Sequence, residues 1–98
     1  MDESEASGIL SDTVSRLRAL SYAELTQKQS ADVDAYEVTG ASGAHYQIEV
    51  EAFWDDPRRK GGNVRVMASI DDGNGWRSIA PMTTSFIVAP DGSFVGEQ

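Results

Sequence analysis

Apolar residues recur three and four positions apart between Ile9 and Leu20, and most of the positions between them are polar or charged. The apolar members of this pattern are Leu10, Val14, Leu17 and Leu20. A helix repeats about every 3.6 residues, so this spacing places their side chains on one face. The pattern predicts an amphipathic helix whose apolar face packs on a core.

The residues after this stretch carry a second helix-start signal. Ser21 and Glu24 have the spacing of a capping box, in which a serine hydroxyl accepts from the backbone three residues on and the glutamate reaches back. This signal predicts a short second helix from Tyr22 to about Gln29. The alternative is a single helix that continues through Ser21, and the motif alone leaves both readings open.

From residue 35 onward the apolar period changes to that of a β-strand. Residues 36–38 predict a first short strand, and the glycine-containing residues 40–43 predict the turn after it. Residues 45–54 alternate most clearly, which indicates a strand with one face buried and one in water. The predicted inner face is Tyr46, Ile48, Val50, Ala52 and Trp54, and the outer face is His45, Gln47, Glu49, Glu51 and Phe53.

The second half of the chain predicts further strands separated by turns. Residues 55–62 combine a proline, two adjacent glycines and several charges, which is typical of an exposed loop. Residues 64–70 alternate again, and residues 76–80 and 86–88 predict two more strands. In the strand at 64–70 the outward positions are Arg65, Met67 and Ser69.

Strands joined by short turns usually pair with their neighbours in sequence. The predicted fold class is therefore α+β: an N-terminal amphipathic helix, with or without a second short helix, packed on a four- to five-stranded antiparallel β-meander. Residues 1–8 are acidic and lack a large apolar side chain after the initial methionine. We predict a disordered acidic tail over residues 1–8 and a single α+β domain over residues 9–98.

The chain has sixteen acidic and eight basic residues, and its formal net charge is −8. Nucleic acids and anionic membranes carry the same sign, so neither is an expected partner. The absence of cysteine excludes disulfides and thiolate sites. The acidic first residues and the lack of an apolar run of about 20 residues indicate a soluble, cytoplasmic protein.

Two candidate catalytic groups lie on the predicted outer face. His45 is the only histidine, and Glu49 is about 13 Å along the same strand, so we interpret His45 as a solvated surface residue. Glu49 and Glu51 are roughly 6 to 7 Å apart, as are some acid/base pairs of glycosidases. No cleft is indicated, and Arg65 on the next strand is expected to pair with at least one of them. We predict no catalytic residues and no enzyme activity.

The turn Asp71-Asp72-Gly73-Asn74-Gly75 has the composition of part of a calcium loop. It lacks the remaining ligand spacing of an EF-hand. A tight hairpin needs the same residue types, because Asp, Asn and Gly all tolerate a positive φ. We therefore predict neither a specific metal site nor a cofactor.

Several short stretches of the C-terminal half form a recognisable set: Trp54-Asp55-Asp56, Arg65-Val66, Asp71-Asp72-Gly73, Phe86-Ile87 and the run from Ala89 to Glu97. With these stretches, residues 46–97 resemble a group of small uncharacterised bacterial proteins. The resemblance covers about half of the chain. It supports the predicted fold and implies no activity.

The predicted outer face also carries an unusual set of apolar side chains. Phe53, Met67 and Ile79 point outward on three successive predicted strands. Exposed apolar streaks mark contact surfaces, although a helix end or the C-terminal segment would also account for this one by covering it. The polar residues that we predict to share this surface are Glu49, Glu51 and Arg65.

These observations favour a small acidic protein-interaction or regulatory module that uses the outer sheet face. The expected partner is a basic protein or a second copy of the chain, and one version is an inhibitor- or immunity-like protein that binds a basic active site. The alternative is a small-molecule or metal-ion-binding domain that uses the acidic turns at Asp55-Asp56 and 71–75.

Overall fold

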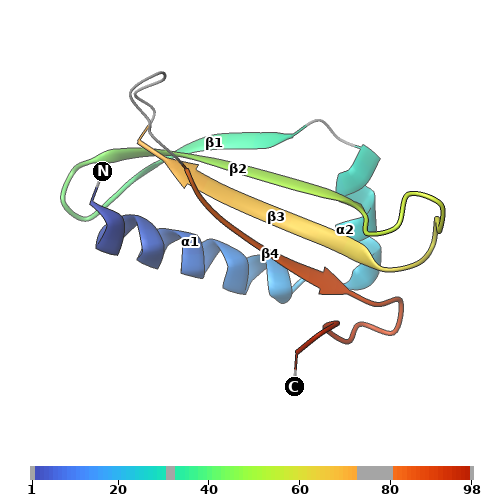
Figure 1. Ribbon diagram of the computed structural model, residues 1–98. Helices are drawn as coiled ribbons and strands as arrows, with labels where there is room; N and C mark the ends of the chain where they lie inside the picture. Colours follow the sequence, from blue (N-terminus) through green and yellow to red (C-terminus); the bar gives the residue numbers. More distant parts are fainter. Residues whose placement is uncertain (1, 31–32, 73–80, 98) are drawn as a thin grey trace.

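A helical layer covers one face of an antiparallel sheet (Figure 1). The computed structural model describes residues 2–30, 33–72 and 81–97. Within these ranges the elements are helices α1 (Glu3–Arg18), α2 (Tyr22–Gln27) and η1 (Lys28–Ser30, a 3₁₀ turn), and strands β1 (Asp34–Thr39), β2 (His45–Trp54), β3 (Val64–Asp71) and β4 (Met82–Val88). The strand order is β1-β2-β3-β4, which confirms the α+β class and the meander.

Helix α1 begins at Glu3, so the expectation of a disordered tail over residues 1–8 is not met by the described residues 2–8. The Asp2 carboxylate caps the helix by accepting from the Glu5 N–H at 3.0 Å. Ala6 is fully buried, because its small side chain lets the helix approach the sheet closely. The sequence pattern weighed only large apolar side chains and therefore missed this first turn and a half.

The predicted capping box is present. The Ser21 hydroxyl accepts from the Glu24 N–H, and the Glu24 carboxylate accepts from the Ser21 N–H, both at 3.1 Å. Helix α1 has already ended at Arg18, and these bonds start α2 at Tyr22, which confirms the two-helix reading. The Tyr22 hydroxyl donates to the Gly62 carbonyl at 2.7 Å and ties α2 to the loop between β2 and β3.

The core lies between the helices and one face of the sheet. Helix α1 contacts β3 and β4, while α2 and η1 contact β2. The alternation predicted for residues 45–54 and 64–70 is observed, with one face of β2 and β3 buried and the other directed away from the helices. The buried hydrophobic residues are Ala6, Leu10, Leu17, Leu25, Tyr46, Ile48, Val50, Ala52, Val64, Val66, Ala68, Ile70, Phe86 and Val88.

Strand β4 begins at Met82, earlier than the sequence pattern indicated. The residues between Met82 and Phe86 are Thr and Ser, so no apolar alternation marks them, yet their register with β3 is regular. The predicted strand at 76–80 lies outside the described residues. No helix in the described ranges is long and apolar enough to cross a membrane.

The C-terminal segment folds back beside the end of β4. Val95 donates its N–H to the Ile87 carbonyl at 2.9 Å, and Phe94 forms an isolated bridge with Val88. The Phe94 ring packs edge-on against Phe86, with ring centroids 5.8 Å apart. The Arg18 guanidinium lies 3.8 Å from the Phe94 centroid and forms an ion pair with Glu97. These contacts join the end of α1 to the end of the chain.

Candidate functional site: the outer face of the sheet

The face of the sheet that points away from the helices has no covering layer among the described residues (Figure 1). The register places Phe53 opposite Arg65 and Arg65 opposite Ile87, so these side chains form one row across β2, β3 and β4. Met67 is the next outward residue of β3. Apolar side chains therefore flank an arginine on this exposed surface.

The Arg65 side chain is fixed by partners on both sides. Its Nε and a terminal nitrogen lie 3.1 and 3.0 Å from Oδ1 of Asp55, and its other terminal nitrogen donates to the Ser85 hydroxyl at 3.3 Å. The guanidinium is thus held in place in the row, with Phe53 and Ile87 on its neighbouring strands. Phe53 keeps 38% of its surface exposed.

The expected pairing of Arg65 with Glu49 or Glu51 is wrong. The register places Met67 opposite Glu51 and Ser69 opposite Glu49, and Arg65 instead reaches Asp55 just beyond the end of β2. Arg65 would lie opposite Glu51 if β3 were shifted by two residues along β2. The sequence of the two strands does not specify their register with that precision.

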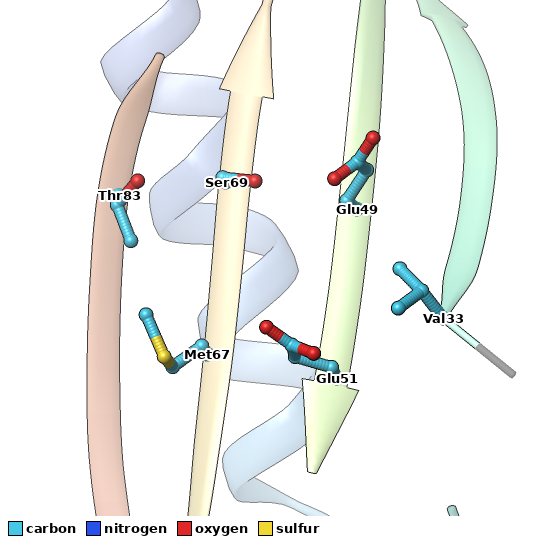
Figure 2. Close-up of a pocket in the computed structure, with 6 residues that line it drawn as sticks. All are labelled: Val33, Glu49, Glu51, Met67, Ser69 and Thr83. Atoms are coloured by element: carbon cyan, nitrogen blue, oxygen red, sulfur yellow. The ribbon is translucent and has the colours of Figure 1, made fainter. Parts of the chain in front are cut away.

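The two glutamates lie beside a shallow depression of about 120 Å³ on the same face (Figure 2). Its lining residues come from all four strands or their ends and are Val33, Glu49, Glu51, Met67, Ser69 and Thr83. No hydrogen bond or ion pair within the described part of the chain engages the side chain of Glu49 or Glu51, and both are exposed.

This arrangement has a definite chemical preference. Two free carboxylates next to the Met67 thioether and the Val33 methyl groups suit a cationic side chain with an aliphatic stem. A lysine or arginine can donate to the carboxylates while its methylene groups contact the apolar atoms. The depression is too shallow for a buried small-molecule site, since such pockets usually enclose about 300–1,000 Å³.

Most of the residues predicted for the site come together. Phe53, Met67, Glu49, Glu51 and Arg65 share the outer face of β2 and β3. Ile79 lies outside the described residues.

Sequence reasoning missed two apolar contributors, Ile87 and Val33. Ile87 sits between two buried residues in an apolar triplet, so its outward direction becomes visible only from its pairing with Arg65. Val33 precedes β1 and carried no strand signal. It keeps 49% of its surface exposed at the rim of the depression.

The acidic turn at Asp55-Asp56 has its oxygens engaged within the chain. Asp55 binds Arg65, and Asp56 Oδ1 accepts from the Arg58 N–H at 3.0 Å and from its Nε at 3.3 Å. Among the described residues, no group of three His, Cys, Asp or Glu side chains is arranged to hold a metal ion. The turn at 71–75 is described only as far as Asp72.

His45 has a carboxylate neighbour on the adjacent strand, which spacing along its own strand does not reveal. Its Nδ1 lies 3.2 Å from Oε1 of Glu37 and 3.2 Å from the Thr39 hydroxyl, both on the adjacent strand β1. The His45 and Glu37 side chains are 68% and 65% exposed. This open pair lacks the shielding from water that strengthens acid–base chemistry in enzyme sites.

Comparison with known proteins adds no relatives: no family model matches the chain, and no curated protein or solved structure matches it. The similarity of residues 46–97 to small uncharacterised bacterial proteins therefore stays a prediction. The geometry of the outer face is the feature of the molecule that bears on function.

Proposed function

We propose that this protein is an interaction module that binds a basic protein through the outer face of its sheet. The observation that carries the proposal is the pair of free carboxylates, Glu49 and Glu51, beside the exposed Phe53 and the half-buried Met67 and Ile87, on a sheet face without a covering layer among the described residues. Exposed apolar surface with a polar rim is typical of protein contact sites.

The contact would have two parts. A lysine or arginine of the partner enters the depression between Glu49 and Glu51, where its stem packs on Met67. Apolar side chains of the partner then cover Phe53 and Ile87, while Arg65 stays bound to Asp55 and keeps the row in place. A few buried anchor residues, often aromatic or arginine, supply most of the affinity in such interfaces.

The overall charge assists the encounter. A net charge of −8 attracts a cationic partner from a distance and raises its association rate at low ionic strength. The same charge disfavours anionic partners, which gives the module selectivity without further contacts.

Binding of a small molecule or metal ion at the Asp55-Asp56 turn has less support. Both aspartates of the Asp55-Asp56 turn are occupied by arginines of the same chain. The depression on the outer face is shallow and open, which favours a protein surface over a small ligand.

A direct test is an NMR titration with a hexapeptide in which arginine alternates with leucine. We expect amide shifts to concentrate at Glu49, Glu51 and Met67. The double variant Glu49→Gln/Glu51→Gln should weaken binding about tenfold, because it removes both charges from the contact.

The matched control is Glu3→Gln/Asp12→Asn, which removes two exposed charges from α1 on the helical side of the molecule. It should bind the peptide almost as well as the wild type. Equal weakening by both double variants would mean that only net charge matters, and the proposed site would be rejected.

A further inference from the structure

The outer edge of β4 is paired with the chain itself over only part of its length. The Ile87 carbonyl accepts from Val95, and the Ala89 N–H donates to the Ser93 carbonyl at 2.8 Å. Residues 87 and 89 thus direct their backbone groups away from β3. In an antiparallel ladder this direction alternates, so Thr83 and Ser85 direct their N–H and C=O groups the same way. In the described ranges no backbone group pairs with them on that side.

The open stretch of edge borders a groove of about 380 Å³ between β4 and α1. The helix side of this groove carries Ser7, Ser11 and Ser15, which recur every four residues and form one stripe of small side chains. All of them are exposed. Thr84 lies on the strand side, facing the helix layer opposite Ala68.

We propose that a second copy of this chain occupies this edge, related by a twofold axis that passes between the two β4 strands near Thr84. The strands would pair antiparallel, and the two α1 helices would pack antiparallel along their serine stripes. This inference uses the backbone edge of β4 and the groove beside α1, and of these residues only Thr83 also lines the outer-face depression. The inference does not depend on the function proposed above.

The strand part of this interface is self-complementary. With Thr84 opposite its own copy, Thr83 of one chain faces Ser85 of the other. Each such pair exchanges two N–H···O bonds, and the twofold axis generates the second pair. The interface thus uses the open backbone groups at Thr83 and Ser85 in both copies.

The helix part fits the same axis. Strands lie about 4.8 Å apart, which places the axis about 2.4 Å from β4 and about 7 Å from β3. Helix α1 contacts both β3 and β4, so the helix axis lies beneath the space between these strands. This position is about 5 Å to the side of the twofold axis. The two helices would then be about 10 Å apart, close to the 8–10 Å of packed helices, and small serines suit that approach.

The charges on α1 also favour an antiparallel pair. Its first turn carries Glu3 and Glu5, and its last turn carries Arg16 and Arg18. An antiparallel partner brings the acidic start of one helix to the basic end of the other. Glu3 and Arg16 are the charges available for this contact, because Glu5 binds Ser42 and Tyr46 and Arg18 binds Glu97 within the same chain. The dipoles of two antiparallel helices point in opposite directions, and their attraction also stabilises the antiparallel pair.

The extent of the contact is limited at both ends. In this register Pro81 of one copy would face Ile87 of the other, where Val95 already lies, so each chain must turn away from the shared edge before Pro81. Pro81 also has no N–H to donate. The shared strand therefore covers Met82 to Phe86. With the helix contact, we expect roughly 1,000–1,200 Å² of buried surface, at the low end for specific interfaces, and dissociation in roughly the micromolar range.

Sedimentation equilibrium from roughly 5 to 500 μM tests the inference. The wild type should change from monomer to dimer over this range. Thr83→Pro removes an outward N–H without touching the ladder to β3, and Ser11→Arg places a long side chain in the helix contact. Each variant should remain monomeric throughout while keeping its circular dichroism spectrum.

Matched controls distinguish this interface from a general effect of charge and from self-association on the outer face. Ala23→Arg adds the same charge as Ser11→Arg at an exposed position of α2 and should dimerise like the wild type. Glu49→Gln/Glu51→Gln should also dimerise, whatever its effect on peptide binding. A monomeric wild type at every concentration would overturn the inference. So would a dimer abolished by Met67→Glu and unaffected by Thr83→Pro and Ser11→Arg, since that result would place the contact on the outer face.

Discussion

The Glu5 carboxylate is a junction between the start of α1 and the β1–β2 turn. It accepts from the Ser42 N–H at 3.0 Å, the Ser42 hydroxyl at 2.6 Å and the Tyr46 hydroxyl at 2.7 Å. Gly40 leaves the room for this arrangement, because a Cβ there would collide with the carboxyl group of Glu5. One side chain thus fixes the first turn of the helix to residues about forty positions away.

These bonds shift two pKa values in opposite directions. Hydrogen bonds from the Ser42 side chain, then from Tyr46 and the Ser42 backbone, lower the pKa of Glu5 below its ordinary 4.5. The bond to Glu5, aided by burial and by nearby carboxylates, raises the pKa of Tyr46 to about 12. The junction therefore needs an ionised glutamate and a protonated tyrosine.

We predict that Glu5→Gln lowers the melting temperature by several degrees at pH 7. A lowered pKa in the folded state means that ionised Glu5 adds its full stability above pH 4.5 and loses it as the pH falls through the folded-state value. The difference in melting temperature between the wild type and Glu5→Gln should therefore become smaller below pH 4.5. On the alkaline side, the contribution of Tyr46 should be lost between pH 10.0 and about 12.

Thermal unfolding followed by circular dichroism at a series of pH values measures this. Glu3→Gln, two residues earlier and exposed, is the control and should change the melting temperature little at any pH. A gap for Glu5→Gln that stays constant down to pH 3 would show that the charge of Glu5 is not the source of its effect.

At the scale of elements, the periodicity of apolar residues identified the strands in which large apolar side chains alternate without a break. The inner faces of β2 and β3 and the capping box at Ser21 were predicted from sequence and are present. The first turn of α1 and the start of β4 were not, because Ala6 is small and because Thr and Ser do not alternate in polarity. The periodicity of apolar residues predicts elements that bury large side chains, and it misses elements that pack through small or polar side chains.

The outer face shows the same limit in another form. Strand parity correctly directed Phe53 and Met67 outward, since parity needs only the sequence of one strand. The partner of Arg65 and the outward direction of Ile87 depend on how two strands pair. Register is set by the whole sheet and its turns, so single-strand patterns cannot supply it.

The C-terminal segment packs on the rest of the molecule through one aromatic side chain, in addition to its backbone hydrogen bonds and the Arg18–Glu97 ion pair. Phe94 contacts Phe86, and the Arg18 guanidinium stacks on its ring while binding Glu97. We predict that Phe94→Ala costs about 2 kcal/mol, less than a fully buried phenylalanine because the ring is only partly buried. The Val95 N–H should then lose its protection against hydrogen exchange, while the amides of β3 keep theirs.

Val95→Ala is the control for this prediction, since the Val95 side chain is 39% exposed and its backbone bond to Ile87 does not depend on it. It should leave the exchange rates of the segment close to those of the wild type. Unchanged protection of the Val95 amide in Phe94→Ala would show that the backbone bonds alone hold the segment.

At the scale of the whole molecule, charge is distributed unevenly along the 40 Å long axis. The start of α1 and the β1–β2 turn lie at one end, and the β2–β3 loop and the C-terminus lie at the other (Figure 1). The described lysines and arginines belong to elements of the second end and are Arg16, Arg18, Lys28, Arg58, Arg59, Lys60 and Arg65. The described carboxylates of the first end are Asp2, Glu3, Glu5, Glu37, Asp71 and Asp72.

This separation predicts opposite results for the same charge reversal at two positions of β1. Glu37 shares a hollow with Asp72 at the acidic end and lies 3.2 Å from Nδ1 of His45. Glu37→Lys gives up the His45 contact but adds an attraction to the carboxylates of this end, so we expect a net stabilisation of at most about 0.5 kcal/mol. Asp34 lies 3.8 Å from Lys28, so Asp34→Lys, with the same change in net charge, should destabilise it. Both effects should shrink as sodium chloride is raised, because exposed charges are screened. Chemical denaturation with urea at low and high salt measures both, and equal stabilisation by the two variants would mean that net charge, rather than its distribution, limits stability.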